Sequence, residues 1–351
     1  MTTATVPSVA PPPLADPSAA APSPKVDTTD TRRPSPWVSF AVRRGIGLVA
    51  SVLALIIITF FMLRLLPGDP AVAVAGTDAT TADVERVRHE LGLDLPLLTQ
   101  FGHYVAGVFT GNMGTSYQWG QPVIAVISSR LPFTLSISLI AIAIVLLVAV
   151  PLGMTVSILT TGGRRSWLDG LFSGATGFVG SVPVYVVATL LVVLFAISLG
   201  WLPPAYSARQ GWLAYILPIV ALAIGPICTV SRVVRRETSV VLEQDYIRTA
   251  HGWRLPHPMV HLKYALPNLI TTTLTLSGLI LTNMLGSALI TETVFGWPGL
   301  GSGVVQAILN KDYPVIQGII LFIGVIAAVL NVLIDLILGI IDPRTLGGSN
   351  D

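Results

Sequence analysis

The chain has 351 residues, of which 52% are apolar and 11% are charged. Ordinary soluble domains carry about 25% charged residues, so this composition excludes a typical soluble globular protein. The 20 basic and 18 acidic residues leave a net charge of +2, which is too small to indicate a nucleic-acid-binding surface. A single cysteine, Cys228, excludes an intramolecular disulfide, and no Cys/His cluster has zinc-site spacing. We therefore expect no metal and no nucleic-acid partner.

Residues 1–36 are rich in proline and alanine and contain no long apolar run. Such a segment cannot bury enough surface to offset its ordering entropy, so we predict a disordered tail. It matches neither a secretory signal, which needs an apolar stretch near Met1, nor a transit peptide, which avoids acids such as Asp16 and Asp27. Residues 346–351 are predicted to form a short C-terminal tail.

Apolar, charge-poor stretches recur through residues 37–345, and each is near or above the roughly 20 residues that a helix needs to cross a bilayer. They predict an all-α polytopic membrane protein with six transmembrane helices. A long external loop is expected at 66–130 and a cytoplasmic loop at 234–264. The predicted spans are residues 45–65, 131–159, 176–200, 212–233, 266–291 and 315–337.

The distribution of basic residues predicts the orientation of these spans. Fourteen of the 20 Lys and Arg residues fall on the side of the tails and the 234–264 loop, five fall on the other side, and Arg64 ends the first span. Basic loops remain in the cytoplasm. We therefore predict that both termini are cytoplasmic and that the chain is a multi-pass protein of the plasma membrane.

The external loop carries two helix patterns. Asp83 to Leu91 has acids in its first turn and Gly92 as its stop, and Leu97 to Val108 has amphipathic spacing. The loop is either a cap on which a delivery protein docks or a helical segment that lies on the membrane surface. The pattern favours neither interpretation.

The cytoplasmic loop has an amphipathic segment that ends at Pro256. Helical spacing places Ile247, Ala250 and Trp253 together, which suits a short helix that enters the groove of a partner. A solvated loop explains the charges but not this alternation. The candidate docking residues are Asp245, Tyr246, Ile247, Arg248, Thr249, Ala250, His251, Gly252, Trp253, Arg254 and Leu255.

Four further residues are candidates for a substrate path. Arg64 and Glu292 are ionisable groups at outer ends of predicted spans, Pro183 is expected to kink the third span, and Ser181 belongs to a stripe of small residues near it. Interface anchoring and helix packing are the alternative roles. His257 and His261 lie four residues apart, but no carboxylate or thiol completes a metal site with them.

An ion-coupled secondary transporter is the main rival function. It needs ionisable residues near the bilayer midplane, and the predicted spans have essentially none apart from Asp335 near the inner end of the sixth. An intramembrane hydrolase is disfavoured because no HExxH pair lies in a span.

The cytoplasmic segment resembles the motif of ABC importer permease subunits, in particular the dipeptide/oligopeptide/nickel branch. Asp245 to Ala250, Leu255 and Leu266-Pro267 match that motif, whereas Arg254 stands where the family places glycine. The likeness extends over about residues 38–345. It includes Leu63 to Pro70, Gly111 to Ser116, Arg130 to Leu135, Glu292 to Gly301 and Asp342 to Arg344.

The resemblance implies a type I ABC importer permease fold in the inner membrane of a prokaryote. It also implies three kinds of partner: a homologous second permease in a heterodimer, one or two cytoplasmic ATPase subunits, and an extracytoplasmic solute-binding protein. The chain has no GxxxxGK[ST] loop, so it is not expected to be an enzyme, and ATP and Mg²⁺ belong to the ATPases. Peptides are the expected cargo, with nickel or another solute as the alternative.

Overall fold

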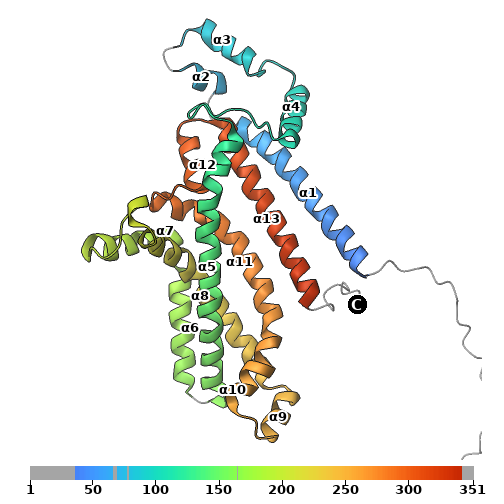
Figure 1. Ribbon diagram of the computed structural model, residues 1–351, viewed down its shortest axis with the longest axis vertical. Coiled ribbons are helices and arrows are strands. Elements are labelled where there is room, and N and C mark those ends of the chain that lie inside the picture. Colours follow the sequence, from blue (N-terminus) through green and yellow to red (C-terminus); the bar gives the residue numbers. More distant parts are fainter. Residues whose placement is uncertain (1–35, 66–68, 77–78, 164, 342–351) are drawn as a thin grey trace, which may run out of the picture.

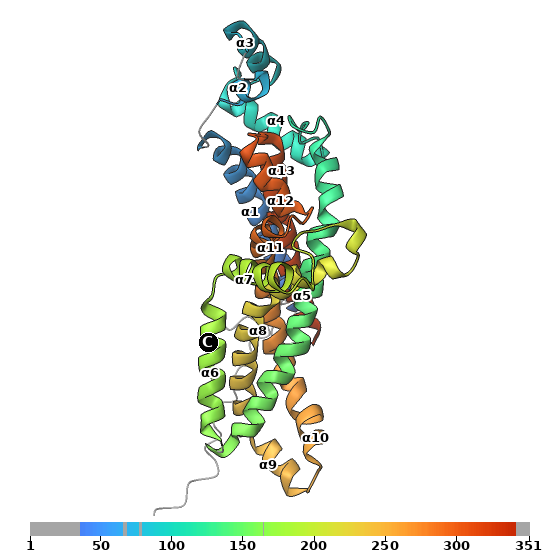
Figure 2. The same ribbon diagram turned by 90° about the vertical axis from the view of Figure 1, so that its left-hand side faces the viewer.

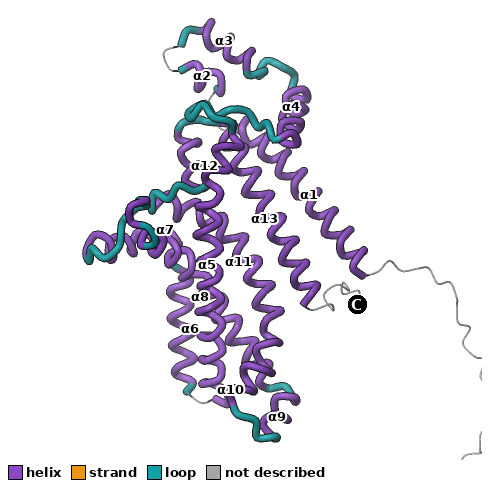
Figure 3. Tube along the Cα trace, viewed as in Figure 1, coloured by secondary structure: helices purple, strands orange, loops and turns teal. Residues whose placement is uncertain are grey.

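The computed structural model describes residues 36–65, 69–76, 79–163 and 165–341 of the chain. Helices account for most of this part, and no strand is found within it (Figure 3). The expected all-α architecture is therefore confirmed for these ranges. The predicted tails lie outside the described residues, apart from Pro36, which begins the first helix.

Four of the described helices are long and apolar enough to cross a membrane. They are α1 (Pro36–Leu65), α5 (Val123–Thr160), α8 (Leu213–Leu242) and α13 (Tyr313–Ile341). The number rises to five when a sharply bent helix pair is counted as one span. A further helix of 29 residues, α11 (Leu266–Val294), crosses the same bundle (Figure 1). The predicted spans are thus confirmed in part.

The third predicted span, residues 176–200, is not one continuous helix. The chain instead forms α6 (Ser166–Ser181) and α7 (Val184–Leu191), and the latter continues into a π-helical turn, Val192–Ser198. The two segments are bent by 92°, so α7 leaves the direction of the bundle (Figure 1). Pro183 explains the break, because it has no N–H to continue α6 and holds Val182 in an extended conformation.

Helices α5 and α8 lie against each other along the lower half of the bundle (Figures 1 and 2). Gly153 permits this approach, because a Cβ atom at that position would lie 2.5 Å from the carbonyl oxygen of Ser231. On α6, by contrast, Gly174 has no neighbour within 4 Å of such an atom. Gly170 and Gly177 are equally open, whereas a Cβ atom at Gly180 would lie 3.2 Å from the Cβ atom of Cys228 on α8.

The predicted external loop forms a helical cap at one end of the bundle, which is called the outer end after that prediction (Figure 2). Both predicted helices are confirmed, as α3 (Thr81–Glu90) and α4 (Leu97–Thr110), and a short α2 (Pro70–Ala75) precedes them. The Tyr104 hydroxyl of α4 lies 2.9 Å from that of Thr59 on α1. One face of α4 therefore covers the outer end of α1, while Leu98 on the other face is 84% exposed.

A carboxylate fixes the rest of this loop to the bundle. Asp312 lies between α12 (Leu300–Leu309) and α13, and it accepts hydrogen bonds from the Ser116 hydroxyl and from the backbone N–H groups of Tyr117 and Gln118. Burial, together with the negative charge of Asp312, raises the pKa of Tyr117 to about 12. The cap is thereby tied to the outer end of the last membrane helix.

Candidate functional site

The predicted cytoplasmic helix is present as α9 (Asp245–Gly252), at the end of the molecule opposite the cap (Figure 1). Ile247 and Ala250 are buried and pack with Val260 of the following π-helical turn, Val260–Ala265. Trp253, which the spacing placed beside them, is instead 72% exposed. The apolar face of α9 is therefore occupied within the chain, and only its other face is open to a partner.

The outward face of α9 combines aromatic and charged groups. Arg248 and Asp245 form an exposed ion pair at 3.5 Å, and Tyr246 is 42% exposed. The Tyr246 hydroxyl also accepts a hydrogen bond from Asn268 Nδ2 at 3.0 Å. Because Asn268 belongs to α11, this contact connects the surface of α9 directly to a bundle helix.

The turn after α9 contains a left-handed backbone conformation, which glycine usually adopts. Gly252 lies inside the helix, whereas Arg254 adopts a positive φ of 57°. This left-handed conformation is unfavourable for a residue with a Cβ atom. Arg254 therefore has the strained backbone conformation at the position where the family places glycine.

The remaining predicted residues of this segment lie in several environments. Leu255 follows Arg254, and its side chain packs against the Ile247 cluster. Thr249 Oγ1 donates to the carbonyl of Asp245, and the His251 side chain lies outside the described part.

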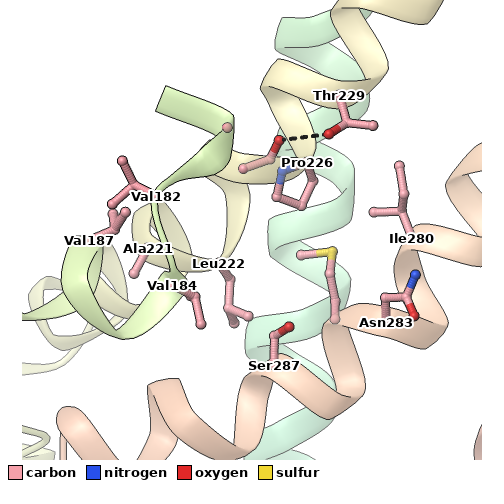
Figure 4. A pocket seen from close by; sticks show the side chains of 13 residues that line it. Val182, Val184, Val187, Ala221, Leu222, Pro226, Thr229, Ile280, Asn283 and Ser287 are labelled. Carbon is pink, nitrogen blue, oxygen red and sulfur yellow. Dashed lines mark hydrogen bonds between the residues drawn. The ribbon is translucent and has the colours of Figure 1, made fainter. Parts of the chain in front are cut away.

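A cavity of about 320 Å³ lies where α6 breaks into α7 (Figure 4). The break contributes Gly180, Val182, Val184 and Val187 to its lining, and the remaining walls come from α8 and α11. Broken helices are a frequent feature of solute sites in transporters, because the interrupted backbone leaves polar groups unpaired. The cavity is therefore the candidate section of a solute path.

The four residues proposed for the path lie in three different places. Ser181 and Pro183 are at the break, interleaved with the lining residues, but both are exposed and neither lines the cavity. Arg64 is in the last turn of α1, and its side chain is not among those described. Glu292 is fully buried at the outer end of α11. The structure does not bring these four residues together.

Glu292 serves the packing of the outer end of the bundle. Its carboxylate accepts hydrogen bonds from the Thr134 hydroxyl and from the N–H groups of Gly301 and Ser302, which open α12. A carboxylate is favourable at a helix N-terminus, where unpaired N–H groups carry partial positive charge. The Glu292 side chain is fully buried, and these hydrogen bonds occupy its carboxylate.

Sequence reasoning missed the residues that do line the cavity. Among them are Thr229 of α8 and Asn283 and Ser287 of α11 (Figure 4). A polar amide in the middle of a membrane-length helix was the available signal for Asn283. Nothing local distinguishes the apolar lining residues from those that face lipid.

Comparisons with known proteins identify the family. Residues 149–347 match the binding-protein-dependent transport system inner membrane component, and residues 37–138 match the N-terminal region of such components. A peptide transport system permease protein of Brucella abortus (strain 2308) is 40% identical over 310 residues, which cover 86% of this chain and 97% of that protein. A glutathione transport system permease protein of Pectobacterium atrosepticum is 34% identical, with 87% and 98% covered.

A solved structure shows the same fold. A chain of the MetNI methionine ABC transporter, in an inward-facing conformation, aligns with a TM-score of 0.50 and 13% sequence identity. The alignment covers 62% of this chain and 97% of that one.

Proposed function

Because the chain belongs to the family of binding-protein-dependent transport system inner membrane components, we propose that it forms half of the translocation pathway of an ATP-driven peptide importer. The observation that carries the proposal is the 40% identity, over 86% of the chain, to a peptide transport permease. Within this function, the cavity at the α6–α7 break belongs to the path, and α9 receives the movement of the ATPases.

The proposed topology has six spans, formed by α1, α5, the bent α6–α7 pair, α8, α11 and α13. Both termini are placed in the cytoplasm of a prokaryote, and the α2–α4 cap is external. The basic residues support this orientation, because Arg235 and Arg236 lie in the last turns of α8 and Arg248 lies in α9, which follows them.

The proposed partners follow from what the chain has and lacks. Its sequence contains no phosphate-binding GxxxxGK[ST] loop, so ATP and Mg²⁺ are assigned to one or two ATPase subunits. A homologous permease completes the path as a heterodimer, and an extracytoplasmic binding protein delivers the solute to the cap. Closure of the ATPases would move α9, and its hydrogen bond to Asn268 would pass the movement to α11.

Two other functions are less well supported. An ion-coupled carrier needs an available ionisable group in a span, whereas Asp335 of α13 forms an ion pair with Arg44 of α1 at 3.0 Å. Nickel as cargo remains the alternative within the family, and the relatives named above are peptide and glutathione permeases.

The coupling role of α9 is tested by exchanging the charges of its ion pair. The double substitution Asp245→Arg and Arg248→Asp keeps an ion pair in the helix but reverses the charge pattern that a partner meets. We expect it to abolish substrate-stimulated ATP hydrolysis in the reconstituted complex. The control exchanges Asp83 and Arg86, an exposed pair with the same spacing in the external cap; because this also removes the Asp83 carboxylate from the capping box of α3, membrane insertion of both variants is measured as well. Unchanged stimulation in the α9 variant would contradict the coupling role.

A further inference from the structure

The cavity at the α6–α7 break has a mainly apolar lining that is interrupted by three neutral polar side chains, Thr229, Asn283 and Ser287. Asn283 lies near the middle of α11, at a depth where an amide that faces hydrocarbon is costly. Within the described part of the chain, neither its amide nor the Ser287 hydroxyl forms a hydrogen bond. Water or the polar groups of a solute in the cavity would satisfy both.

The backbone of α8 adds a hydrogen-bond acceptor to this wall. Pro226 has no N–H to donate to the carbonyl of Leu222 four residues earlier, and both residues line the cavity. The cavity therefore offers the amide and hydroxyl of α11 (Figure 4), and α8 adds a carbonyl that lacks its usual helical donor. These groups complement the N–H and C=O groups of a peptide main chain.

A positive charge lies at the edge of the same cavity. Arg232 is three residues after Thr229 on α8, so both side chains leave the same face of the helix. A Cβ atom at Gly180, which lines the cavity, would lie 4.0 Å from Arg232 Nη2. Arg235 pairs with Asp169, but the exposed Arg232 forms no ion pair with any residue that the structure describes.

We propose that this cavity holds the passing peptide by its main-chain amides and that Arg232 pairs with its terminal carboxylate. The inference rests on the proposed function and names the part of the solute that is recognised. A guanidinium binds a carboxylate through two parallel hydrogen bonds. Because every linear peptide with a free C-terminus carries these groups, the cavity accepts varied side chains but discriminates against peptides without a free carboxylate.

The test compares a tripeptide with its C-terminal amide in proteoliposomes that contain the complete importer and its binding protein. The same binding protein serves every variant, so a difference between variants belongs to the permease. We expect Arg232→Gln to lower uptake of the free acid by about tenfold, as for a lost charge-assisted contact, and to leave uptake of the amide nearly unchanged. Arg232→Lys should retain part of the preference.

Arg236→Gln is the matched control, because it removes the same charge from an exposed position one turn further along α8. It should leave the ratio of acid to amide uptake as in the unmodified complex. If Arg232→Gln lowers the uptake of both solutes equally, Arg232 has a structural role and the inference is overturned. If the unmodified complex shows no ATP-driven uptake of any peptide, the proposed function itself fails.

A second measurement tests the inference if the importer complex with Arg232→Gln does not assemble. Cys228 is the only cysteine, so Cys228→Ala followed by Asn283→Cys places a single thiol in the cavity. An anionic methanethiosulfonate should label this thiol faster than a cationic one, because Arg232 is nearby, and the tripeptide should slow the labelling. The absence of labelling, or of protection by the peptide, would also overturn the inference.

Discussion

Thr134 and Glu292 are 158 positions apart in the sequence, yet the Thr134 hydroxyl donates a hydrogen bond of 2.6 Å to the Glu292 carboxylate. The same hydroxyl accepts the N–H of Leu300 at 2.8 Å. One buried pair therefore joins the outer ends of α5 and α11 to the start of α12. This contact therefore holds the three helices together at the end of the bundle that carries the cap.

Glu292→Ala should destabilise the outer end of the bundle. It leaves the Thr134 hydroxyl and the N–H groups of Gly301 and Ser302 without their acceptor. Hydrogen bonds to charged groups contribute about 1.5–3 kcal/mol each, so we expect the free energy of unfolding to fall by at least about 3 kcal/mol. Thermal unfolding of the purified complex measures the change. Glu90→Ala, at an exposed position on α3, is the control, and an equal effect of the two substitutions would refute the role.

The turn between α3 and α4 should depend on pH. The His89 ring lies 2.7 Å from the Asp94 carboxylate, and this contact raises the pKa of His89 and lowers the pKa of Asp94. Stability from His89 is complete below its unfolded pKa of about 6.5 and is lost as the pH rises through the higher folded value. Stability from Asp94 is present above its unfolded pKa and is lost as the pH falls through the lower folded value.

The pair is therefore strongest between about pH 4 and pH 6.5. Hydrogen exchange of the amides of this turn should be slower at pH 6 than at pH 8, after correction for intrinsic rates. Asp94→Asn should remove the difference. If the difference persists in this variant, another titratable group causes it.

Arg254→Gly should have a small, favourable effect. Glycine relieves the left-handed strain at φ 57° but gives the unfolded chain more freedom, so the net gain is expected to stay within about 1 kcal/mol. Substrate-stimulated ATP hydrolysis should stay within about twofold of the unmodified complex, because the buried Ile247 and Ala250 still hold α9. Arg254→Val, with a branched Cβ, should instead lower the melting temperature. Loss of assembly in the glycine variant would show that the Arg254 side chain makes an essential contact.

Gly153→Ala and Gly174→Ala should have opposite effects. The added methyl group at Gly153 would meet the backbone of α8, and such overpacking costs about 1–3 kcal/mol. Gly174 has open space around it in a helix interior, where alanine is favoured by about 0.5–1 kcal/mol. The two melting temperatures of the purified chain should therefore move in opposite directions. Equal losses would mean that α6 is packed against a neighbour through Gly174.

Composition and local pattern were sufficient for much of this molecule. The long apolar stretches predicted α1, α5, α8 and α13, and the amphipathic spacing predicted α4 and α9. The boundaries were less accurate, because helices continue past the apolar stretch wherever no proline or glycine stops them. Arg235 and Arg236, for example, lie inside α8 and not in the predicted 234–264 loop.

The family and its cytoplasmic motif were also readable from the sequence, because each depends on residue type and spacing along one segment. The burial of Glu292, the position of Trp253 outside the Ile247 cluster and the 92° break at Pro183 were decided by the tertiary structure. The tertiary structure also decided the cavity, because its walls come from helices that are distant in sequence. Hydropathy and helix propensity are properties of neighbouring residues, whereas burial and cavities depend on which distant surfaces meet.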